Sequence, residues 1–194
     1  MDTYLCASNP YSGKLNCDNT FNLTVEPLPI QDFDIHLMSD TDISSCTGLI
    51  SKAMNPDEGQ MALNTFLFHF SCKEYNIDDG RTYFVLTKNA HIIGIVGLHH
   101  YHWGPPENVW LAWFAVDPDH HGQGIGKYLL NFITNKARTL GYKKFFIETY
   151  SGPEFTRARS FYQSQGFIKV GSVQSYLSNG DNMIIFLKNL ILPV

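Results

Sequence analysis

Apolar residues recur at helical spacing in several stretches of the chain. Helices are expected over residues 39–54, over residues 57–75 behind Pro56, and over residues 154–164. A further helix is indicated by an apolar stripe that recurs every fourth residue: Ile125, Leu129, Ile133 and Ala137. Such a stripe covers the face of a sheet, and Gly141 supplies the end of the helix.

Runs rich in β-branched and aromatic residues alternate with turn residues and predict the strands of a sheet. The expected strands are residues 33–38, 82–86, 91–98, 108–116, 143–150, 167–176 and 183–187. Turns at residues 88–90 and 178–181 close two hairpins within this series. Because antiparallel strands come first and a strand, a helix and a strand follow, the pattern predicts a mixed α/β (α+β) fold with a right-handed crossover.

Length and composition set the domain organisation. The chain has 194 residues, of which 44% are hydrophobic, and this is enough for the core of one domain. We assign that domain to residues 32–194. Residues 1–31, which are rich in Asn, Ser, Asp and Pro, are expected to form an N-terminal extension.

Charge and hydropathy exclude several classes of binding partner. The formal net charge of −4 and the lack of a long Lys/Arg run argue against a nucleic-acid or anionic-membrane partner. No apolar run is long enough to span a bilayer, and the first residues lack the basic start and apolar core of a signal peptide, so a cytoplasmic protein is expected. The cysteines lack metal-ligand spacing and are expected as reduced thiols, the alternative being disulfides in a secreted protein.

The most specific chemical signal is a glycine-rich junction between an apolar strand and a helix, residues 116–130. With no Cβ at its three alternating glycines, the amides of residues 123–126 can converge on phosphate oxygens at the positive end of the helix. A dinucleotide fingerprint needs its third glycine one residue later, and a P-loop needs Ser or Thr where Tyr128 stands. The junction therefore predicts a phosphorylated cofactor held largely by main-chain amides.

At this junction the chain resembles the GNAT superfamily of acyl-CoA-dependent N-acetyltransferases. The pyrophosphate signature of that family is Gln or Arg, two residues, Gly, one residue, then Gly or Ala; residues 121–126 fit it with His121 in the Gln/Arg position. Residues 113–118 resemble the splayed fourth strand of the family, and residues 158–167 match its A-x-x-F-Y-x-x-x-G-F helix and turn. The resemblance implies a GNAT-like fold, in which helices flank a central, mostly antiparallel mixed sheet with a splayed parallel strand pair.

The same resemblance implies acetyl-CoA as cosubstrate, without a metal. Amides of the splayed strand, carried over to Phe114 and Val116, are expected to bind the pantetheine arm and the thioester oxygen. The other cofactor-binding residues that the resemblance implies are His121, Gly122, Gln123, Gly124, Ile125, Gly126, Lys127, Ala158 and Tyr162. Tyr162 is also the expected catalytic acid for the leaving thiolate. Arg157 or Arg159 stands close to a position where the family often has Asn, and is expected to approach cofactor phosphate.

The base that accepts the ammonium proton is the least determined part of the expected site. Glu148, on the strand after the glycine-rich helix start, points toward the splay in the expected register and is the first candidate. Its rivals are Glu107, a histidine among His99, His100 and His102, and water alone. Two of these histidines share one face of a strand, but two ligands with no carboxylate or cysteine nearby do not predict a metal site.

The expected activity is transfer of an acetyl group from acetyl-CoA to a primary amine of a small molecule, by direct attack in a ternary complex. No cysteine lies between residues 107 and 167, so a thiol intermediate has no support. Two alternatives stay open, a peptide or protein N-acetyltransferase and a non-catalytic CoA-binding sensor on the same scaffold. A homodimer is a further expectation, which rests on the family alone.

Overall fold

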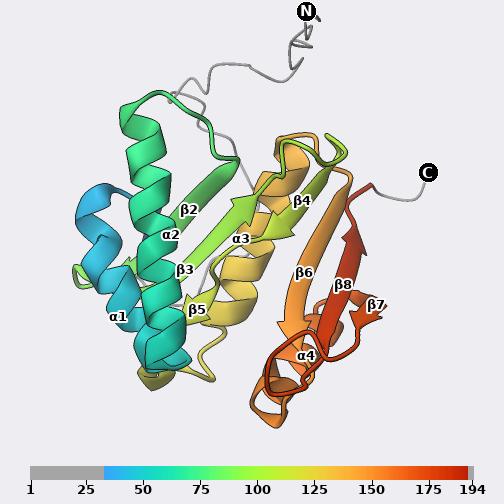
Figure 1. The fold of residues 1–194 in the computed structure, drawn as a ribbon. Helices are drawn as coiled ribbons and strands as arrows, with labels where there is room; N and C mark the ends of the chain where they lie inside the picture. The colour runs from blue at the N-terminus through green and yellow to red at the C-terminus, as the bar shows by residue number, and fades with distance from the viewer. Residues whose placement is uncertain (1–32, 192–194) are drawn as a thin grey trace, which may run out of the picture.

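A mixed sheet forms the centre of the molecule (Figure 1). The structure is a computed structural model that describes residues 33–191, so the expected N-terminal extension lies outside the described residues. The strands are β1 (Phe33–Leu37), β2 (Arg81–Lys88), β3 (His91–His99), β4 (Asn108–Leu111), β5 (Ala115–Val116), β6 (Lys144–Tyr150), β7 (Ile168–Val173) and β8 (Met183–Asn189). They lie in the order β1-β2-β3-β4-β6-β8-β7, and β5 also pairs with β3. Among these strands only β4 and β6 pair in parallel, which confirms the expected fold class.

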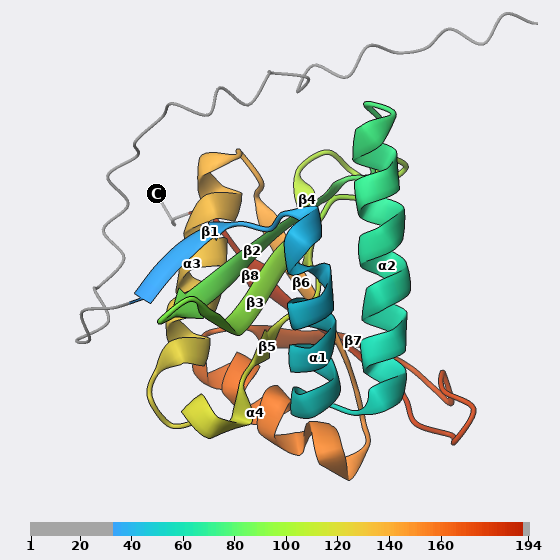
Figure 2. The same cartoon turned by 90° about the vertical axis from the view of Figure 1, so that its left-hand side faces the viewer.

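Helices cover both faces of this sheet. α1 (Ile43–Ala53) and α2 (Pro56–Glu74) lie side by side on one face, and α3 (Ile125–Thr139) lies on the other (Figure 2). The short α4 (Thr156–Ser164) lies at the lower end of β6 and β8 in Figure 1. No helix within residues 33–191 is long and apolar enough to cross a membrane.

Each face of the sheet has its own core. The core under α3 buries the expected apolar stripe, Ile125, Leu129, Ile133 and Ala137, at 1% exposure or less. The core under α1 and α2 buries Cys46, Ile50, Ala62 and Phe66 against Tyr83, Val85 and Ile95. The sheet is thus held from both sides, and this fixes the positions of the loops at its strand ends.

Two expected helices begin later than their sequence pattern indicates, because their first residues form 3-10 turns. Residues Asp40–Asp42 precede α1, and there the Ser39 amide donates to the Asp42 carboxylate at 2.8 Å. Residues Pro153–Phe155 precede α4. α2 starts at Pro56 as expected, since the Asn55 side chain accepts a hydrogen bond from an amide of its first turn at 2.9 Å.

The prediction of a single strand over residues 108–116 is wrong, because the structure has two strands there. Leu111 of β4 lies opposite Leu98 of β3, whereas Ala115 of β5 lies opposite Ile95. Four steps along β4 and β5 therefore match three steps along β3, which defines a β-bulge between the two strands. A bulge bends the strand that carries it, and the continuous apolar run in the sequence gives no sign of the extra residue.

The expected strand over residues 167–176 is also shorter in the structure. β7 ends at Val173, and Ser175 has a φ of 48°, in the left-handed region that a strand does not use. The chain therefore leaves the sheet before Tyr176 and enters the loop that connects β7 with β8.

Candidate functional site

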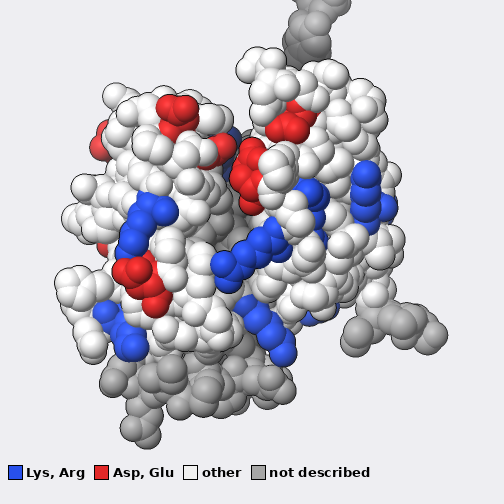
Figure 3. All heavy atoms as spheres, turned by 90° about the horizontal axis from the view of Figure 1, so that it is seen from below, with Lys and Arg blue, Asp and Glu red and all other residues white. Residues whose placement is uncertain are grey.

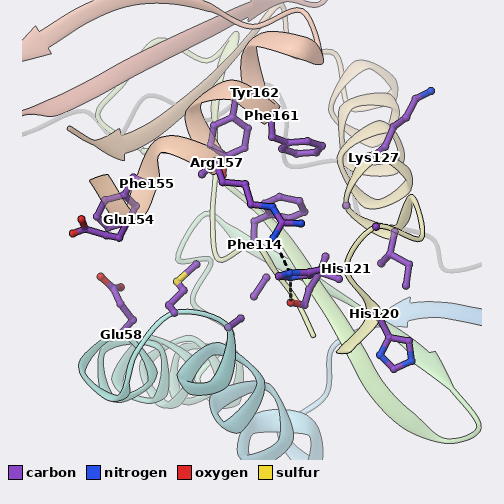
Figure 4. A pocket seen from close by; sticks show the side chains of 18 of the residues that line it. Glu58, Phe114, His120, His121, Lys127, Glu154, Phe155, Arg157, Phe161 and Tyr162 are labelled. Atoms are coloured by element: carbon purple, nitrogen blue, oxygen red, sulfur yellow. Dashed lines mark hydrogen bonds between the residues drawn. The ribbon is translucent and has the colours of Figure 1, made fainter. Parts of the chain in front are cut away.

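A cavity of about 570 Å³ opens where the glycine-rich junction faces the start of α2. Its walls come from the α1–α2 connection, β5, the residues around the glycines, and α4 (Figure 4). The view from below shows a cleft between two halves of the molecule, with acidic side chains on both sides toward the top and basic ones beneath them (Figure 3). Glu58 and Glu154 are the acidic residues of the cavity wall, and Lys127 and Arg157 carry its positive charges.

The loop before α3 presents main-chain amides to this cavity. Gly122 and Gly124 have φ values of 80° and 81°, a left-handed conformation that favours glycine. A Cβ at either position would meet no protein atom within 4 Å, so the space beside them is open. Within the described residues no amide from residue 122 to 127 donates a hydrogen bond, and Tyr128 is the first to do so, to Gly124 at 3.0 Å. Free N–H groups at a positive helix end fit an anion such as a phosphate.

The structure brings most of the expected loop residues into the cavity wall. His121, Gly122, Gly124, Ile125, Gly126 and Lys127 line it. Gln123 is exposed and does not line it. The Lys127 side chain points away from the other labelled residues (Figure 4), so its charge acts at the rim of the cavity rather than at its centre.

His121 is held between a carbonyl and a guanidinium. Its Nε2 lies 3.1 Å from the carbonyl oxygen of Val116, and its Nδ1 lies 3.2 Å from a guanidinium nitrogen of Arg157 (Figure 4). A carbonyl only accepts and a guanidinium only donates, so Nε2 carries the ring proton and Nδ1 accepts. His121 thereby fixes Arg157 beside the free amides. Arg159, the alternative, instead donates to the carbonyls of Tyr150 and Gly152, at 2.6 and 2.8 Å, and closes the connection to α4.

Lys52 of α1 fixes the chain that leads into this loop. Its ammonium donates to Asp117 and to Asp119, at 2.7 Å in both cases, and the Asp119 amide donates to Asp117 at 2.9 Å. Burial raises the pKa of Asp117, but the bonds from Lys52 and from the amide outweigh burial and hold the pKa below its ordinary value. No local sequence pattern predicts this contact, because Lys52 precedes Asp117 by 65 residues.

β4 and β6 separate beside the cavity. Their parallel pairing ends with Trp110 opposite Phe146, and beyond this point β5 pairs with β3. The Asp117 amide donates to a carbonyl of β3 at 2.9 Å. Because alternate amides of a strand point to opposite sides, the amide of Val116 points away from β3, into the gap that β6 has left. Val116 and Phe114, which lies in the bulge, both line the cavity.

α4 contributes aromatic rings and a phenol. Ala158, Phe161 and Tyr162 line the cavity, and Phe161 stacks on Phe114 with ring centroids 6.1 Å apart. Tyr162 is 8% exposed and packs edge-on against Phe167. Burial raises the pKa of its phenol, so the hydroxyl stays protonated at neutral pH and can donate a hydrogen bond.

Glu148 and Tyr162, the two expected catalytic residues, do not share this cavity wall. Glu148 is exposed and lies outside the wall. Its Oε1 accepts a hydrogen bond from the Tyr150 hydroxyl at 2.9 Å. A proton that reaches Glu148 from the cavity therefore needs an intermediate carrier, such as this hydroxyl or a water.

The expected rival bases have other contacts. His100 and His102 lie 3.1 and 2.9 Å from main-chain carbonyl oxygens, so each ring is held by the backbone. Burial and the charge of Arg81 lower the pKa of His99 to about 4. Within residues 33–191 no group of three or more His, Cys, Asp or Glu side chains could hold a metal ion.

The family model described as the Acetyltransferase (GNAT) family matches residues 51–167. This stretch is more than half of the chain and contains both the glycine-rich junction and α4. The chain belongs to the GNAT acetyltransferase family. The resemblance that rested on two sequence motifs is thereby confirmed, and so is the prediction of an acyltransferase at the level of the family.

Individual relatives differ in what their names say they acetylate. An amino-acid acetyltransferase from Yersinia pseudotuberculosis is 42% identical over 57 residues, and this match spans 29% of the present chain and 12% of the length of the relative. A GNAT-family protein from Desulfovibrio desulfuricans gives a TM-score of 0.73 at 20% identity, over 82% of this chain and 99% of that one. An aminoglycoside 6′-N-acetyltransferase solved with coenzyme A gives a TM-score of 0.65 at 13% identity, and the match covers 83% of this chain and 99% of that one. At these identities the two structures show the shared fold alone.

Proposed function

We propose that the protein is an N-acetyltransferase that transfers the acetyl group of acetyl-CoA to a primary amine of a small molecule. One observation carries the proposal: residues 122 and 124–127, whose amides are unpaired within the described residues, lie in the wall of a cavity that reaches the gap beside β5. Family membership and the coenzyme A bound to the aminoglycoside enzyme support acetyl-CoA as the cosubstrate.

The residues present fit the successive parts of this cosubstrate. The amides of the glycine loop bind the diphosphate, and the Arg157 guanidinium adds a charged donor beside them. The amides of Phe114 and Val116 bind the pantetheine arm and the thioester carbonyl in the strand gap. This placement brings the thioester next to Tyr162.

The reaction is acyl transfer from sulfur to nitrogen. The acceptor ammonium gives up one proton, its nitrogen attacks the carbonyl carbon, the C–N bond forms, and the C–S bond breaks. Main-chain N–H groups of the splayed strand stabilise the negative charge that develops on the carbonyl oxygen. The Tyr162 hydroxyl protonates the departing sulfur, and the second proton lost by the nitrogen restores Tyr162. One proton is released to solvent overall.

Glu148 is the proposed acceptor of the first proton. Tyr150, whose hydroxyl donates to Glu148, contacts Phe155 of the cavity wall with ring centroids 5.3 Å apart. A proton can therefore pass from the amine to Glu148 through this hydroxyl or through a water. Because Glu148 is exposed, it can return the proton to solvent after each turnover.

A thiol-release experiment tests this function against the two alternatives. Purified protein incubated with acetyl-CoA and a panel of small amines is expected to release free thiol, which a colorimetric reagent measures. A CoA-binding sensor predicts that acetyl-CoA raises the Tm while no amine causes thiol release. A peptide N-acetyltransferase predicts release with peptides and none with small amines. Either of these two results overturns the proposal.

We expect Arg157→Gln to raise the Kd for coenzyme A about tenfold, because it removes a charge-assisted donor beside the loop and leaves a shorter, uncharged polar side chain. Isothermal titration calorimetry at low and high salt measures this, and the difference from wild type should shrink as salt screens the charge. Arg138→Gln is the matched control. It removes the same charge near the end of α3, where Arg138 donates to Asn135 and Leu190, and should leave the Kd unchanged. A wild-type Kd for Arg157→Gln contradicts the assigned contact.

A further inference from the structure

Aromatic and acidic side chains that the cofactor does not use lie on the face of β6 opposite α3. The odd-numbered residues of β6 are buried, so Phe146, Glu148 and Tyr150 point to the face on which α1 and α2 lie. From this side α2 brings Glu58 into the cavity wall, beneath Phe155 in the close view (Figure 4). The gap between β4 and β6 opens onto the same face. An amine that approaches the thioester from here therefore passes these side chains.

Half-buried aromatic rings line the route by which the amine approaches. Trp110 stacks on Phe146 with ring centroids 4.9 Å apart, and Tyr101 lies against Trp110 at 5.9 Å. Tyr150 stacks on Tyr176 at 6.2 Å, and Tyr176 is 52% exposed. Partly exposed rings of this kind can bind both an apolar stem and a cation. We call these five rings, together with Glu58 and Glu148, the acceptor wall.

The carboxylates of the acceptor wall raise the pKa of its tyrosine hydroxyls. Burial and the charge of Glu148 raise the pKa of Tyr101. The same two effects raise the pKa of Tyr150, and the hydrogen bond from the Tyr150 hydroxyl to Glu148 adds to the rise. The charge of Glu58 adds to the rise at Tyr150. Tyr150 donates to Glu148, and its ring contacts Phe155, which lines the cavity together with Glu58, so the two carboxylates approach this region from β6 and from α2.

The neighbouring cations do not neutralise this wall. Arg81, whose charge opposes the rise in the pKa of Tyr101, is paired with the Asp79 carboxylate at 3.2 Å. With its pKa lowered to about 4, His99 is uncharged at neutral pH. The positive charges of the cavity wall, Lys127 and Arg157, belong to the cofactor end. A carboxylate on the acceptor would therefore meet like charge, whereas an ammonium would meet two carboxylates and several rings.

We infer that the acceptor is a primary ammonium on an apolar alkyl or aryl stem, with no carboxylate beside the amine. The inference rests on the proposed function and names the class of amine that the same site takes. The rings bind the stem. Glu58 and Glu148 bind the ammonium, and Glu148 then receives its proton.

Paired amines test the inference. Phenethylamine and phenylalanine share a stem and differ by one carboxylate beside the amine, and pentylamine and norleucine form the corresponding alkyl pair. In at least one pair, kcat/KM for the amine is expected to exceed kcat/KM for its amino acid by more than about tenfold, measured by thiol release. The two pairs show whether the rings select an aryl or an alkyl stem. A smaller ratio in both pairs overturns the inference.

Glu58→Gln tests the acidic part of the wall. The KM for the preferred amine is expected to rise about tenfold while kcat stays within about twofold, because the side chain keeps its size and loses its charge. Asp57→Asn removes the same charge one residue earlier, at an exposed position outside the cavity wall, and should leave that KM unchanged. If the KM rises equally in the two variants, the effect comes from long-range electrostatics alone, and the role of Glu58 in binding the ammonium is overturned. Tyr176→Ala, which removes a ring outside the sheet, should also raise this KM.

Failure of the inference can be told apart from failure of the proposed function. Amine binding to the protein saturated with coenzyme A is also measured without turnover, by tryptophan fluorescence, since Trp110 is part of the wall. If no amine causes thiol release, the proposed function fails, and the fluorescence titration still decides whether the amine binds more tightly than its carboxylated counterpart. If carboxylated amines react fastest, the function stands and the inference fails.

Discussion

Tyr162→Phe is expected to lower kcat about 100-fold, while the KM for acetyl-CoA changes by less than about threefold. The substitution removes one oxygen and keeps the ring that packs against Phe167 and Phe186, so the fold should persist. The lost hydroxyl is the proposed proton donor for the departing sulfur. No other hydroxyl-bearing side chain lines the cavity within the described residues, so no second hydroxyl of the cavity wall takes its place. Steady-state kinetics with saturating amine measure both parameters.

Tyr142→Phe supplies the matched control for this result. Tyr142 follows α3 at the end distant from the cavity, and burial raises its pKa as it does that of Tyr162. Its substitution should leave kcat within about twofold of wild type, because it touches none of the reacting groups. If Tyr162→Phe keeps the wild-type kcat and loses only thermal stability, Tyr162 belongs to the core and not to the reaction.

Sequence patterns predicted the elements of this fold wherever one face of an element is buried. The stripe of α3 was predictable because one side of a helix packs on a sheet, and every fourth residue must then be apolar. The split between β4 and β5 was not predictable in this way. Both strands are apolar, and the extra residue between them is fixed by pairing with β3, which lies elsewhere in the sequence.

The two ends of the candidate site differ in how much local sequence reveals. At the cofactor end, the free amides follow one another along the chain, so the spacing of the glycines points to them directly. The contact that fixes Arg157 joins it to His121, 36 residues earlier, and only the fold reveals it. The acceptor wall is more dispersed still, since its side chains come from α2, β4, β6 and the loops. The alternation along β6 predicts that Glu148 shares a face with Phe146 and Tyr150, but it does not identify the rings of the other elements that lie on this face.

Gly124→Trp is expected to raise the Kd for coenzyme A more than about 100-fold. A side chain at this position starts in open space beside the loop, where its Cβ meets no protein atom within 4 Å. An indole there would occupy the place proposed for the diphosphate. The φ of 81° also strains any residue other than glycine, so a loss of binding has to be separated from a loss of folding.

Gly141→Trp carries the same backbone strain away from the cavity. Gly141 follows the end of α3 with a φ of 86°, and a Cβ there also meets nothing within 4 Å. The two variants should therefore lose similar thermal stability, measured as Tm, while calorimetry with coenzyme A should show lost binding for Gly124→Trp alone. If Gly141→Trp binds as weakly, the loss at Gly124 reflects folding. If both bind as wild type does, the glycine loop is not the phosphate site, and the proposed placement of the cofactor fails with it.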